Sequence, residues 1–337
     1  MPPNLAFGPV PSRRLGNSLG VNNVPAKTCS YDCVYCQLGP APPRLERRAF
    51  YDPADVLEAV RSRLEEVRRR GSGVDYLTFV PDGEPTLDLN LGKEIELLKG
   101  LGVPVAVITN SSLLFEASVR DDLRSADLVS VKVDACSERT WRLVDRPHKS
   151  LSLARVLQGL QDFSREYRGT LLTETMLVGG VDYSTEAEGL ARLIAGLEPE
   201  RAYLTVPTRP PAEPWVRPAP EGQVNVVLQA VMDLVPRVEL LTRGESGEFG
   251  GTGEAELDLL ATAAVHPMTQ ESAEELLRRD GAGPDLLERM LREEKLVRIS
   301  YGGKTFYARR ASQRADRPNP SAAGSKDGAA KADRHGP

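Results

Sequence analysis

Three of the four cysteines in this 337-residue chain stand close together. Cys29, Cys33 and Cys36 follow the spacing C-x3-C-x2-C, whereas Cys136 lies about a hundred residues away. Secreted disulfide frameworks spread their cysteines to close loops, so a tight trio in a long chain indicates a metal site instead. Thiolates are the usual ligands of iron–sulfur clusters, and three on one loop can hold three corners of a four-iron cluster. The fourth iron would stay open to a small molecule, as in catalytic metal sites.

The alternative for this loop is a structural zinc site. Structural zinc takes four protein ligands, most often at paired spacings such as two C-x2-C groups. The second pair is missing here, and His148 and His266 lie far from the loop in the sequence. The sequence therefore favours a cluster over zinc.

Short apolar runs alternate with amphipathic stretches from about residue 17 to residue 242. Strands alternating with helices indicate a parallel sheet with right-handed crossovers. Six such units are two fewer than a closed eightfold barrel has. The sequence therefore predicts an α/β fold, an open partial (β/α)6 barrel. Its strands are expected at residues 19–24, 74–80, 103–109, 128–133, 170–178 and 202–206, with a further short strand at 238–241.

The C-terminal part of the chain differs in composition. A Pro-rich segment, residues 207–220, excludes regular helix and central strand and is expected to lie as an arm across the barrel rim. Three short helical patterns and a Gly-Gly hairpin then follow in the order of a winged helix. The last stretch has almost no large apolar residue and is expected to be disordered. The predicted domains are a barrel with its arm at 1–246, a winged helix at 247–310 and a disordered tail at 311–337.

The cysteine loop resembles that of the radical S-adenosylmethionine (SAM) superfamily, which has the same spacing and an aromatic residue, here Tyr35, before the last cysteine. The resemblance implies a partial six-unit barrel, in agreement with the strand count. It also implies an oxidoreductase-like enzyme with one 4Fe–4S cluster on Cys29, Cys33 and Cys36, whose open iron binds SAM. An electron from the cluster then gives a 5′-deoxyadenosyl radical, which the protein positions and shields. The implied electron donor is a reductant such as flavodoxin or ferredoxin.

The second predicted strand ends in a turn that is similar to the superfamily's Gly-Gly-Glu-Pro motif, with Asp82 in place of the first glycine. In the family, this motif holds the methionine ammonium of SAM. A glycine lets the backbone approach closely, a proline fixes the turn, and carbonyls or a carboxylate accept from the ammonium. Gly83, Glu84 and Pro85 are therefore predicted to bind SAM. The alternative is an ordinary strand-to-helix turn.

Polar side chains also mark the later strands. Asn110 follows the third strand, Lys132 and Asp134 alternate with valines on the fourth, and Glu174 lies on the fifth. Alternating residues of a strand share one face, and a buried polar face is costly unless it is used. The resemblance places SAM contacts in this region, so these four residues and Tyr35 are predicted to bind SAM. The alternative for each is a solvated position on the rim, and no catalytic residue is predicted.

The N-terminal segment FGPVPSRRLG, residues 7–16, extends the resemblance to a bacterial and archaeal subgroup grouped with the wyosine-base synthases. Those enzymes remodel a guanine in transfer RNA, hold a second cluster and use a lysine that forms a Schiff base with pyruvate. Here only Cys136 is left over, and one thiolate cannot hold a second cluster. RNA base modification is thus one candidate function, and a radical reaction on a small molecule or a protein is another.

The alternative from another class of protein is an iron–sulfur regulator. In such a protein the cluster senses redox state and the winged helix binds DNA. The turn at Asp82 argues against a regulator, because a redox sensor needs no binding site for SAM. Residues 254–310 carry nine Lys or Arg against eleven Asp or Glu, unlike a duplex-binding domain. The hairpin is the exception, and its edge is predicted either to bind RNA or to dock a protein partner or the barrel. Its cations and aromatic residues are Arg298, Lys304, Arg309, Arg310, Tyr301, Phe306 and Tyr307.

Charge and hydropathy limit the partners and the cellular location that the sequence allows. The formal net charge of −5 makes the whole chain a poor match for nucleic acid or an anionic membrane. No apolar run reaches the roughly 18 residues of a membrane helix, and no signal peptide is evident at the N-terminus. The sequence therefore predicts a cytoplasmic protein with no membrane partner.

Overall fold

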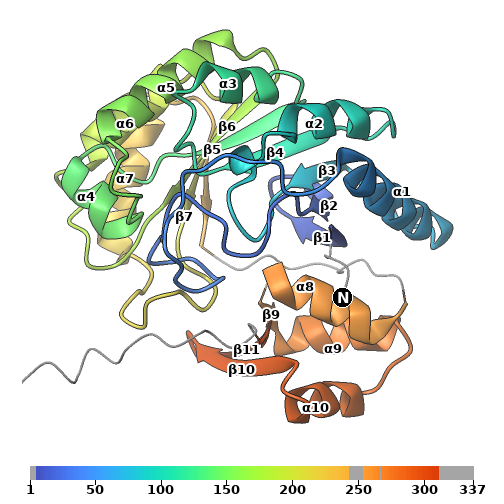
Figure 1. The fold of residues 1–337 in the computed structure, drawn as a ribbon. Coiled ribbons are helices and arrows are strands. Elements are labelled where there is room, and N and C mark those ends of the chain that lie inside the picture. The colour runs from blue at the N-terminus through green and yellow to red at the C-terminus, as the bar shows by residue number, and fades with distance from the viewer. Residues whose placement is uncertain (1–4, 243–252, 266, 311–337) are drawn as a thin grey trace, which may run out of the picture.

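The computed structural model describes residues 5–242, 253–265 and 267–310 (Figure 1). The predicted disordered tail, 311–337, lies outside the described residues, as does most of the segment that joins the two predicted domains. Eight strands form one sheet in sequence order, from β1 at one edge to β8 at the other. The strands are β1 (Ala6–Ser12), β2 (Gly16–Val21), β3 (Tyr76–Phe79), β4 (Val105–Thr109), β5 (Leu128–Lys132), β6 (Thr170–Met176), β7 (Arg201–Thr205) and β8 (Val238–Leu241).

The predicted α/β architecture with a mostly parallel sheet is confirmed. Neighbouring strands from β2 to β8 pair in parallel, as expected for strands joined by crossovers. One strand was not predicted: β1 pairs with β2 antiparallel, with an irregularity between Phe7 and Val10. Its prolines hide it in the sequence, because proline is tolerated in a sheet only at an edge or a bulge, and β1 is an edge strand. The predicted first strand also ends earlier, at Val21.

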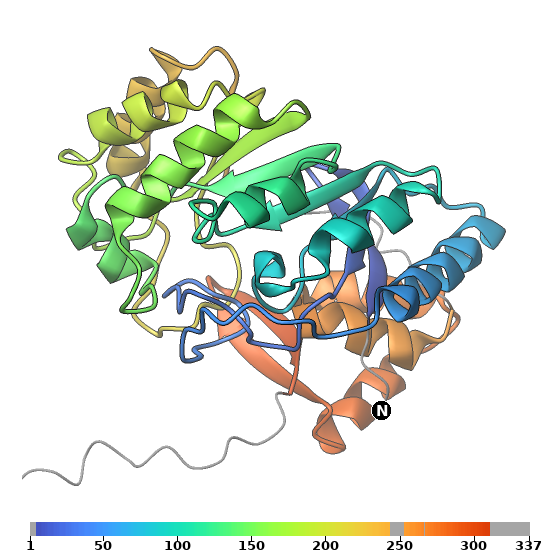
Figure 2. The ribbon, with the colours of Figure 1, turned by 45° about the horizontal axis from the view of Figure 1, so that its top comes forward.

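Helices cover the outer face of the sheet (Figure 2). In the first of them the local sequence accounts for both the start and the buried stripe. The Asp52 side chain caps the helix by accepting from the amide of Ala54 at 2.9 Å, and Pro53 occupies the first turn. Val56 and Val60 lie on the buried face, and a fully buried valine contributes roughly 1.5–3 kcal/mol. The helices are α1 (Pro53–Arg69), α2 (Leu91–Lys99), α3 (Ala117–Leu123), α4 (Glu138–Val144), α5 (Leu153–Glu166), α6 (Ala187–Gly196) and α7 (Glu221–Met232).

Alternation along the strands separates the helix-covered core from a polar interior. On β5, Val129 and Val131 are buried in the core, whereas Lys132 faces the other way into a pocket. On β6, Leu171 belongs to the core and Glu174 lines the pocket. The period of two along β5 and β6 therefore places Lys132 and Glu174 inside the barrel, and Leu128 and Leu172 on the same faces belong to a small apolar cluster.

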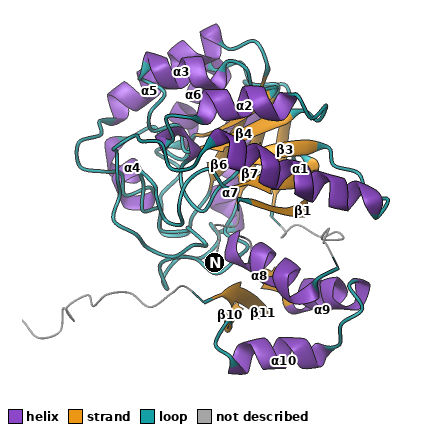
Figure 3. Cartoon of the chain, turned by 45° about the vertical axis from the view of Figure 1, so that its right-hand side comes forward, coloured by secondary structure: helices purple, strands orange, loops and turns teal. Residues whose placement is uncertain are grey.

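The C-terminal unit, residues 253–310, follows the barrel and packs beside β1 (Figures 1 and 3). Three helices and a hairpin are present where the sequence predicted them, and the strands form a sheet in the order β10-β11-β9. Its elements are α8 (Ala255–Val265), β9 (Met268–Thr269), α9 (Gln270–Arg279), α10 (Pro284–Arg292), β10 (Leu296–Tyr301) and β11 (Lys304–Arg309). In the described part of the chain, no helix is long and apolar enough to cross a membrane.

The hairpin edge differs from its sequence-based description. Phe306 and Tyr307 are 3% and 2% exposed, so they are not available for stacking on a base. Arg298 is paired with Glu288, and Arg310 with Glu294, each at 2.9 Å. Neighbouring residues of a strand face opposite sides, so both sides of β11 are covered at this point, and Tyr307 belongs to the core of the C-terminal unit.

Candidate functional site

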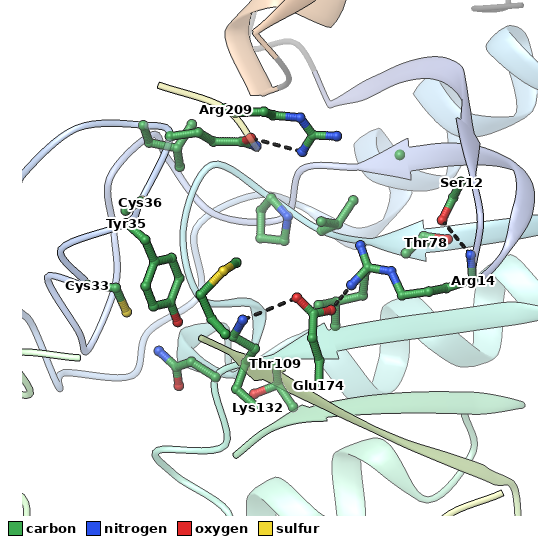
Figure 4. A pocket seen from close by; sticks show the side chains of 18 of the residues that line it. Ser12, Arg14, Cys33, Tyr35, Cys36, Thr78, Thr109, Lys132, Glu174 and Arg209 are labelled. Atoms are coloured by element: carbon green, nitrogen blue, oxygen red, sulfur yellow. Dashed lines mark hydrogen bonds and ion pairs between the residues drawn. The ribbon is translucent and has the colours of Figure 1, made fainter. Parts of the chain in front are cut away.

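A pocket of about 340 Å³ lies inside the barrel (Figure 4). Its volume falls in the range of small-molecule sites. The pocket is lined largely by the loops that follow successive parallel strands, as expected for a functional site in a barrel. The loop after β2 supplies the cysteines, the turn after β3 supplies Gly83 and Glu84, and Asn110 directly follows β4. Arg209 comes from the Pro-rich arm after β7, which also contributes Pro207 and Thr208 to the pocket lining.

Most of the sequence-predicted site residues come together here. Nine of them line the pocket, and two lie directly behind its lining. The carbonyl of buried Pro85 accepts from Asn23 at 3.2 Å, and Asp134 accepts from the hydroxyl of Tyr35. The nine lining residues are Cys29, Cys33, Tyr35, Cys36, Gly83, Glu84, Asn110, Lys132 and Glu174.

The three cysteines supply the donor set that a cluster needs. Asn110 Nδ2 donates to Cys29 Sγ at 3.4 Å, and Cys33 Sγ donates to Asp145 Oδ1 at 3.5 Å. Burial raises the pKa of Cys29 to about 12 and raises the pKa of Cys33 and of Cys36. The thiols therefore stay protonated in the protein alone, and the charge of bound iron has to favour the thiolates. No three His, Cys, Asp or Glu side chains in the described ranges are grouped to hold a single metal ion.

The turn after β3 is fastened to the cysteine loop. The amide of Glu84 donates to the carbonyl of Thr28 at 2.8 Å, and the amide of Lys27 donates to the carbonyl of Asp82 at 2.5 Å. A Cβ atom at Gly83 would lie 2.1 Å from the Thr28 oxygen, so only glycine permits this approach. The two motifs that the sequence analysis singled out thus form one unit, and its residues fit a cluster with a cofactor seated beside it.

Comparison with known proteins identifies the family. The radical SAM superfamily matches residues 23–194, about half of the chain. The chain belongs to the radical SAM superfamily. Its cofactors are accordingly a 4Fe–4S cluster and SAM, and the predicted enzyme class is confirmed.

The chain is also similar to proteins of its own length. A UPF0026 protein from Methanocaldococcus jannaschii is 43% identical over 92% of this chain and 97% of its own. Among solved structures, a radical SAM methyltransferase from Sphaerobacter thermophilus has a similar fold, with a TM-score of 0.50, 17% identity and 67% of each chain covered. A structure of TYW1 with a lysine–pyruvate adduct has a TM-score of 0.44 at 16% identity, covering 56% of this chain and 64% of that one.

Glu84 is the most heavily bonded carboxylate of the radical SAM pocket. Its Oε1 accepts from the hydroxyls of Thr86 and Thr109, each at 2.6 Å, and from the Thr86 amide at 3.2 Å. Its Oε2 accepts from the amide of Asn110 at 2.8 Å. Burial raises the pKa of Glu84, and these four hydrogen bonds oppose that shift. Glu84 thus ties the turn after β3 to the end of β4, and Oε2 retains accepting capacity toward the pocket.

A chain of charged groups crosses the interior of the barrel. Lys132 Nζ lies 3.2 Å from Glu174 Oε1 and 4.9 Å from the centre of the Tyr35 ring. Arg14, from the turn between β1 and β2, forms an ion pair with the same Glu174 carboxylate (Figure 4). Sequence reasoning missed Arg14 as a pocket residue, because only the pairing of β1 with β2 brings it opposite β6.

Asp145 is a second residue that sequence reasoning missed. It follows α4 and is 3% exposed, with Oδ1 3.4 Å from the Tyr35 hydroxyl and 3.5 Å from Cys33 Sγ. Burial and the nearby Asp134 carboxylate hold the pKa of Asp145 well above its usual range. No sequence signal distinguishes it, because a polar residue directly after a short helix is ordinarily a solvated cap.

Cys136 lies apart from the radical SAM pocket. Its Sγ donates to Glu186 Oε2 at 3.2 Å, and burial raises its pKa to about 12. The same glutamate accepts from the hydroxyls of Ser137 and Thr140 at the start of α4. Cys136 therefore belongs to the packing around this helix start.

Proposed function

We propose that the chain holds one 4Fe–4S cluster on Cys29, Cys33 and Cys36 and cleaves SAM in the adjoining pocket. When bound, the reduced cluster supplies one electron to the sulfonium of SAM, which yields methionine and a 5′-deoxyadenosyl radical. The observation that carries the proposal is the fastening of the turn at Gly83 to the cysteine loop. That contact joins two segments whose residues both line the pocket, which supports a cluster and SAM bound side by side.

The residues around the turn have separate proposed roles. Gly83, Glu84 and Pro85 seat the methionine ammonium through backbone carbonyls and the free side of the Glu84 carboxylate. Lys132 is the cation placed to attract the methionine carboxylate, with Glu174 holding its ammonium at 3.2 Å. Tyr35, Asp134 and Asn110 fix the side of the pocket next to the cysteines. Apart from Pro85 and Asp134, which lie directly behind the lining, each of these groups already lies at the pocket wall.

The proposal is tested by anaerobic reconstitution with iron and sulfide, followed by dithionite and SAM. We expect about four irons per chain, from three thiolates for one cubane, and formation of 5′-deoxyadenosine and methionine. Protein that carries the cluster and binds SAM yet forms no 5′-deoxyadenosine under dithionite would contradict the proposed reaction. The cysteines need a reducing compartment, so we further propose a cytoplasmic enzyme with flavodoxin or ferredoxin as its electron donor.

We propose RNA as the substrate class, with the C-terminal unit as a winged helix forming a separate domain over 247–310. Support comes from Lys304 and Arg309 on the hairpin. Both are exposed, and neither has an ion-pair partner among the described residues, whereas Arg298 and Arg310 do. Unpaired cations are what a phosphate backbone requires. A small molecule or a protein is the alternative substrate.

The RNA proposal makes a prediction about salt dependence. Binding of transfer RNA, measured at several salt concentrations, should weaken in Lys304→Ala/Arg309→Ala, with a salt slope smaller by about two, one for each lost phosphate contact. Arg298→Ala is the matched control, since its guanidinium is already paired with Glu288. Equal binding by the double variant and the wild type at every salt concentration would remove the hairpin from the RNA contact.

A further inference from the structure

One side of the pocket is backed by the C-terminal unit. Phe7 and Val10 of β1 line the pocket, and the same two side chains are buried in the core of the C-terminal unit. Val80, at the end of β3, also lines the pocket and packs against that core. The Phe7 ring lies across Gly20 of β2, where an added Cβ would be 2.1 Å from the ring. A single layer of side chains therefore separates the pocket from the C-terminal core.

The hairpin of the C-terminal unit also holds the Pro-rich arm. The hydroxyl of Tyr301 donates to the carbonyl of Pro207 at 3.2 Å. Pro207, Thr208 and Arg209 line the pocket, and Arg209 Nη1 donates to Gln37 Oε1 of the cysteine loop at 3.0 Å. The hairpin, the arm and the loop next to Cys36 are thus joined in series across the pocket rim.

A buried ion pair fastens the C-terminal unit to the barrel. Arg63 of α1 donates through Nε to the carbonyl of Gly8 at 2.8 Å and through Nη2 to Asp258 Oδ1 at 2.7 Å. The Asp258 and Arg63 side chains are 1% and 12% exposed. Removing Arg63 alone would leave the Asp258 carboxylate buried without this counter-charge, so the docked arrangement depends on the arginine. It acts directly behind Phe7 and Val10, because Gly8 lies between them on β1.

We propose that the C-terminal unit closes the reaction pocket on the β1 side, and that Arg63 and Tyr301 are the positioning residues that hold it there. A partial barrel has open sheet edges, and β1 is one of them. Radical chemistry needs a site from which water and stray hydrogen donors are excluded. The inference rests on the proposed function only in taking this pocket as the reaction site, since the contacts themselves do not depend on it.

The first test removes the contacts of Arg63 with Asp258 and Gly8. Arg63→Met keeps an unbranched apolar stem and loses both donors, and Arg61→Met on the exposed face of α1 is the matched control. In cluster-free protein, amide hydrogen exchange at Val206, Thr208 and Arg209 should rise at least about tenfold in Arg63→Met and stay unchanged in Arg61→Met. In reconstituted protein without reductant, SAM affinity should fall about tenfold in Arg63→Met, as for a typical coupling between linked sites.

The second test changes one oxygen atom, so that the proposal remains testable if Arg63→Met fails to fold. Tyr301→Phe should raise exchange at the same three amides about fivefold, the effect of one lost hydrogen bond. Ser300→Ala, on an exposed neighbour in the same strand, should leave that exchange unchanged. Unchanged exchange in both folded variants would overturn the proposal, and so would faster exchange with SAM affinity intact. Failure of the wild type to cleave SAM would instead contradict the proposed function, because the exchange measurements need neither cluster nor SAM.

Discussion

The barrel pocket and the surface of the C-terminal unit use the same charged contacts in different surroundings. Glu84 is 2% exposed and accepts four hydrogen bonds, whereas Arg298 and Glu288 form a 2.9 Å ion pair with side chains 52% and 57% exposed. Water replaces a lost partner at the surface but not in the pocket, so the same substitution has different consequences. Burial, rather than contact distance, therefore decides which residues of this chain are sensitive to change.

The largest effect is expected at the cysteine loop. Replacing Cys29, Cys33 and Cys36 together by Ala should abolish the cluster's visible absorbance and all SAM cleavage, because no other thiolates are available in the pocket. Iron content, absorbance and 5′-deoxyadenosine formation measure the outcome. Cys136→Ser is the control and should keep all three, since its thiol is bonded to Glu186 instead. A wild-type iron content of about eight, halved in Cys136→Ser, would instead indicate a second cluster.

Glu84→Gln is expected to have the next largest effect. The variant keeps the shape of the side chain but turns an amide NH2 toward groups that themselves donate, and it removes the charge proposed to face the ammonium. SAM affinity of the reconstituted protein should fall about ten- to a hundredfold, from a lost charge-assisted hydrogen bond. The cluster absorbance should remain. The exposed Glu46→Gln is the control, and unaltered SAM binding in Glu84→Gln would remove this carboxylate from the cofactor seat.

Asp82 connects the two regions through pH. Burial raises its pKa from 3.8 to about 7, and the charge of Arg309 on β11 opposes the shift. A raised carboxyl pKa stabilises the fold at low pH, and this contribution is lost as pH rises through about 7. Because the ordinary carboxyl pKa is 3.8, Asp82→Asn should match the wild type only below about pH 4, and its stability relative to the wild type should rise by up to roughly 4 kcal/mol between about pH 4 and pH 8. Chemical denaturation of cluster-free protein measures this difference, and a pH-independent difference would contradict it.

The smallest effect is expected at the exposed ion pair of the C-terminal unit. Arg298→Ala should change the free energy of unfolding by less than about 1 kcal/mol, because exposed pairs gain little and are screened by salt. Arg63→Ala, which breaks the buried pair with Asp258, should destabilise by about 3–5 kcal/mol. Denaturant titrations of the two variants measure the contrast. Equal losses would show that burial does not separate these contacts.

Local sequence patterns were sufficient to predict the barrel and the central residues of the candidate site. The spacing of Cys29, Cys33 and Cys36, the turn at Gly83 and the period of two along β5 and β6 are short-range patterns that depend on few neighbours. Strand ends of a parallel sheet meet at one rim, so residues such as Asn110 and Glu174 could be grouped in advance. Helix α1 was equally evident, because its cap and its buried stripe lie within one segment.

The edge strand β1 could not be predicted because of its prolines. The sequence also did not show whether the aromatic side chains of the hairpin would be buried or exposed. Alternation predicts that residues of a strand divide between two faces, but it does not say which face meets another element. Phe306 and Tyr307 became buried because another part of the protein covers them. The predicted RNA-binding edge was accordingly reduced to Lys304 and Arg309.

The sequence by itself determined the cofactor chemistry, because ligand types and their spacing are local properties of one loop and one turn. The tertiary structure alone decided that Arg14 meets Glu174, that Asp145 lies beside Cys33, and that the core of the C-terminal unit backs the pocket at Phe7. These contacts join residues far apart in the chain. Their partners are fixed by strand pairing and by the burial of apolar surface, which no single segment specifies.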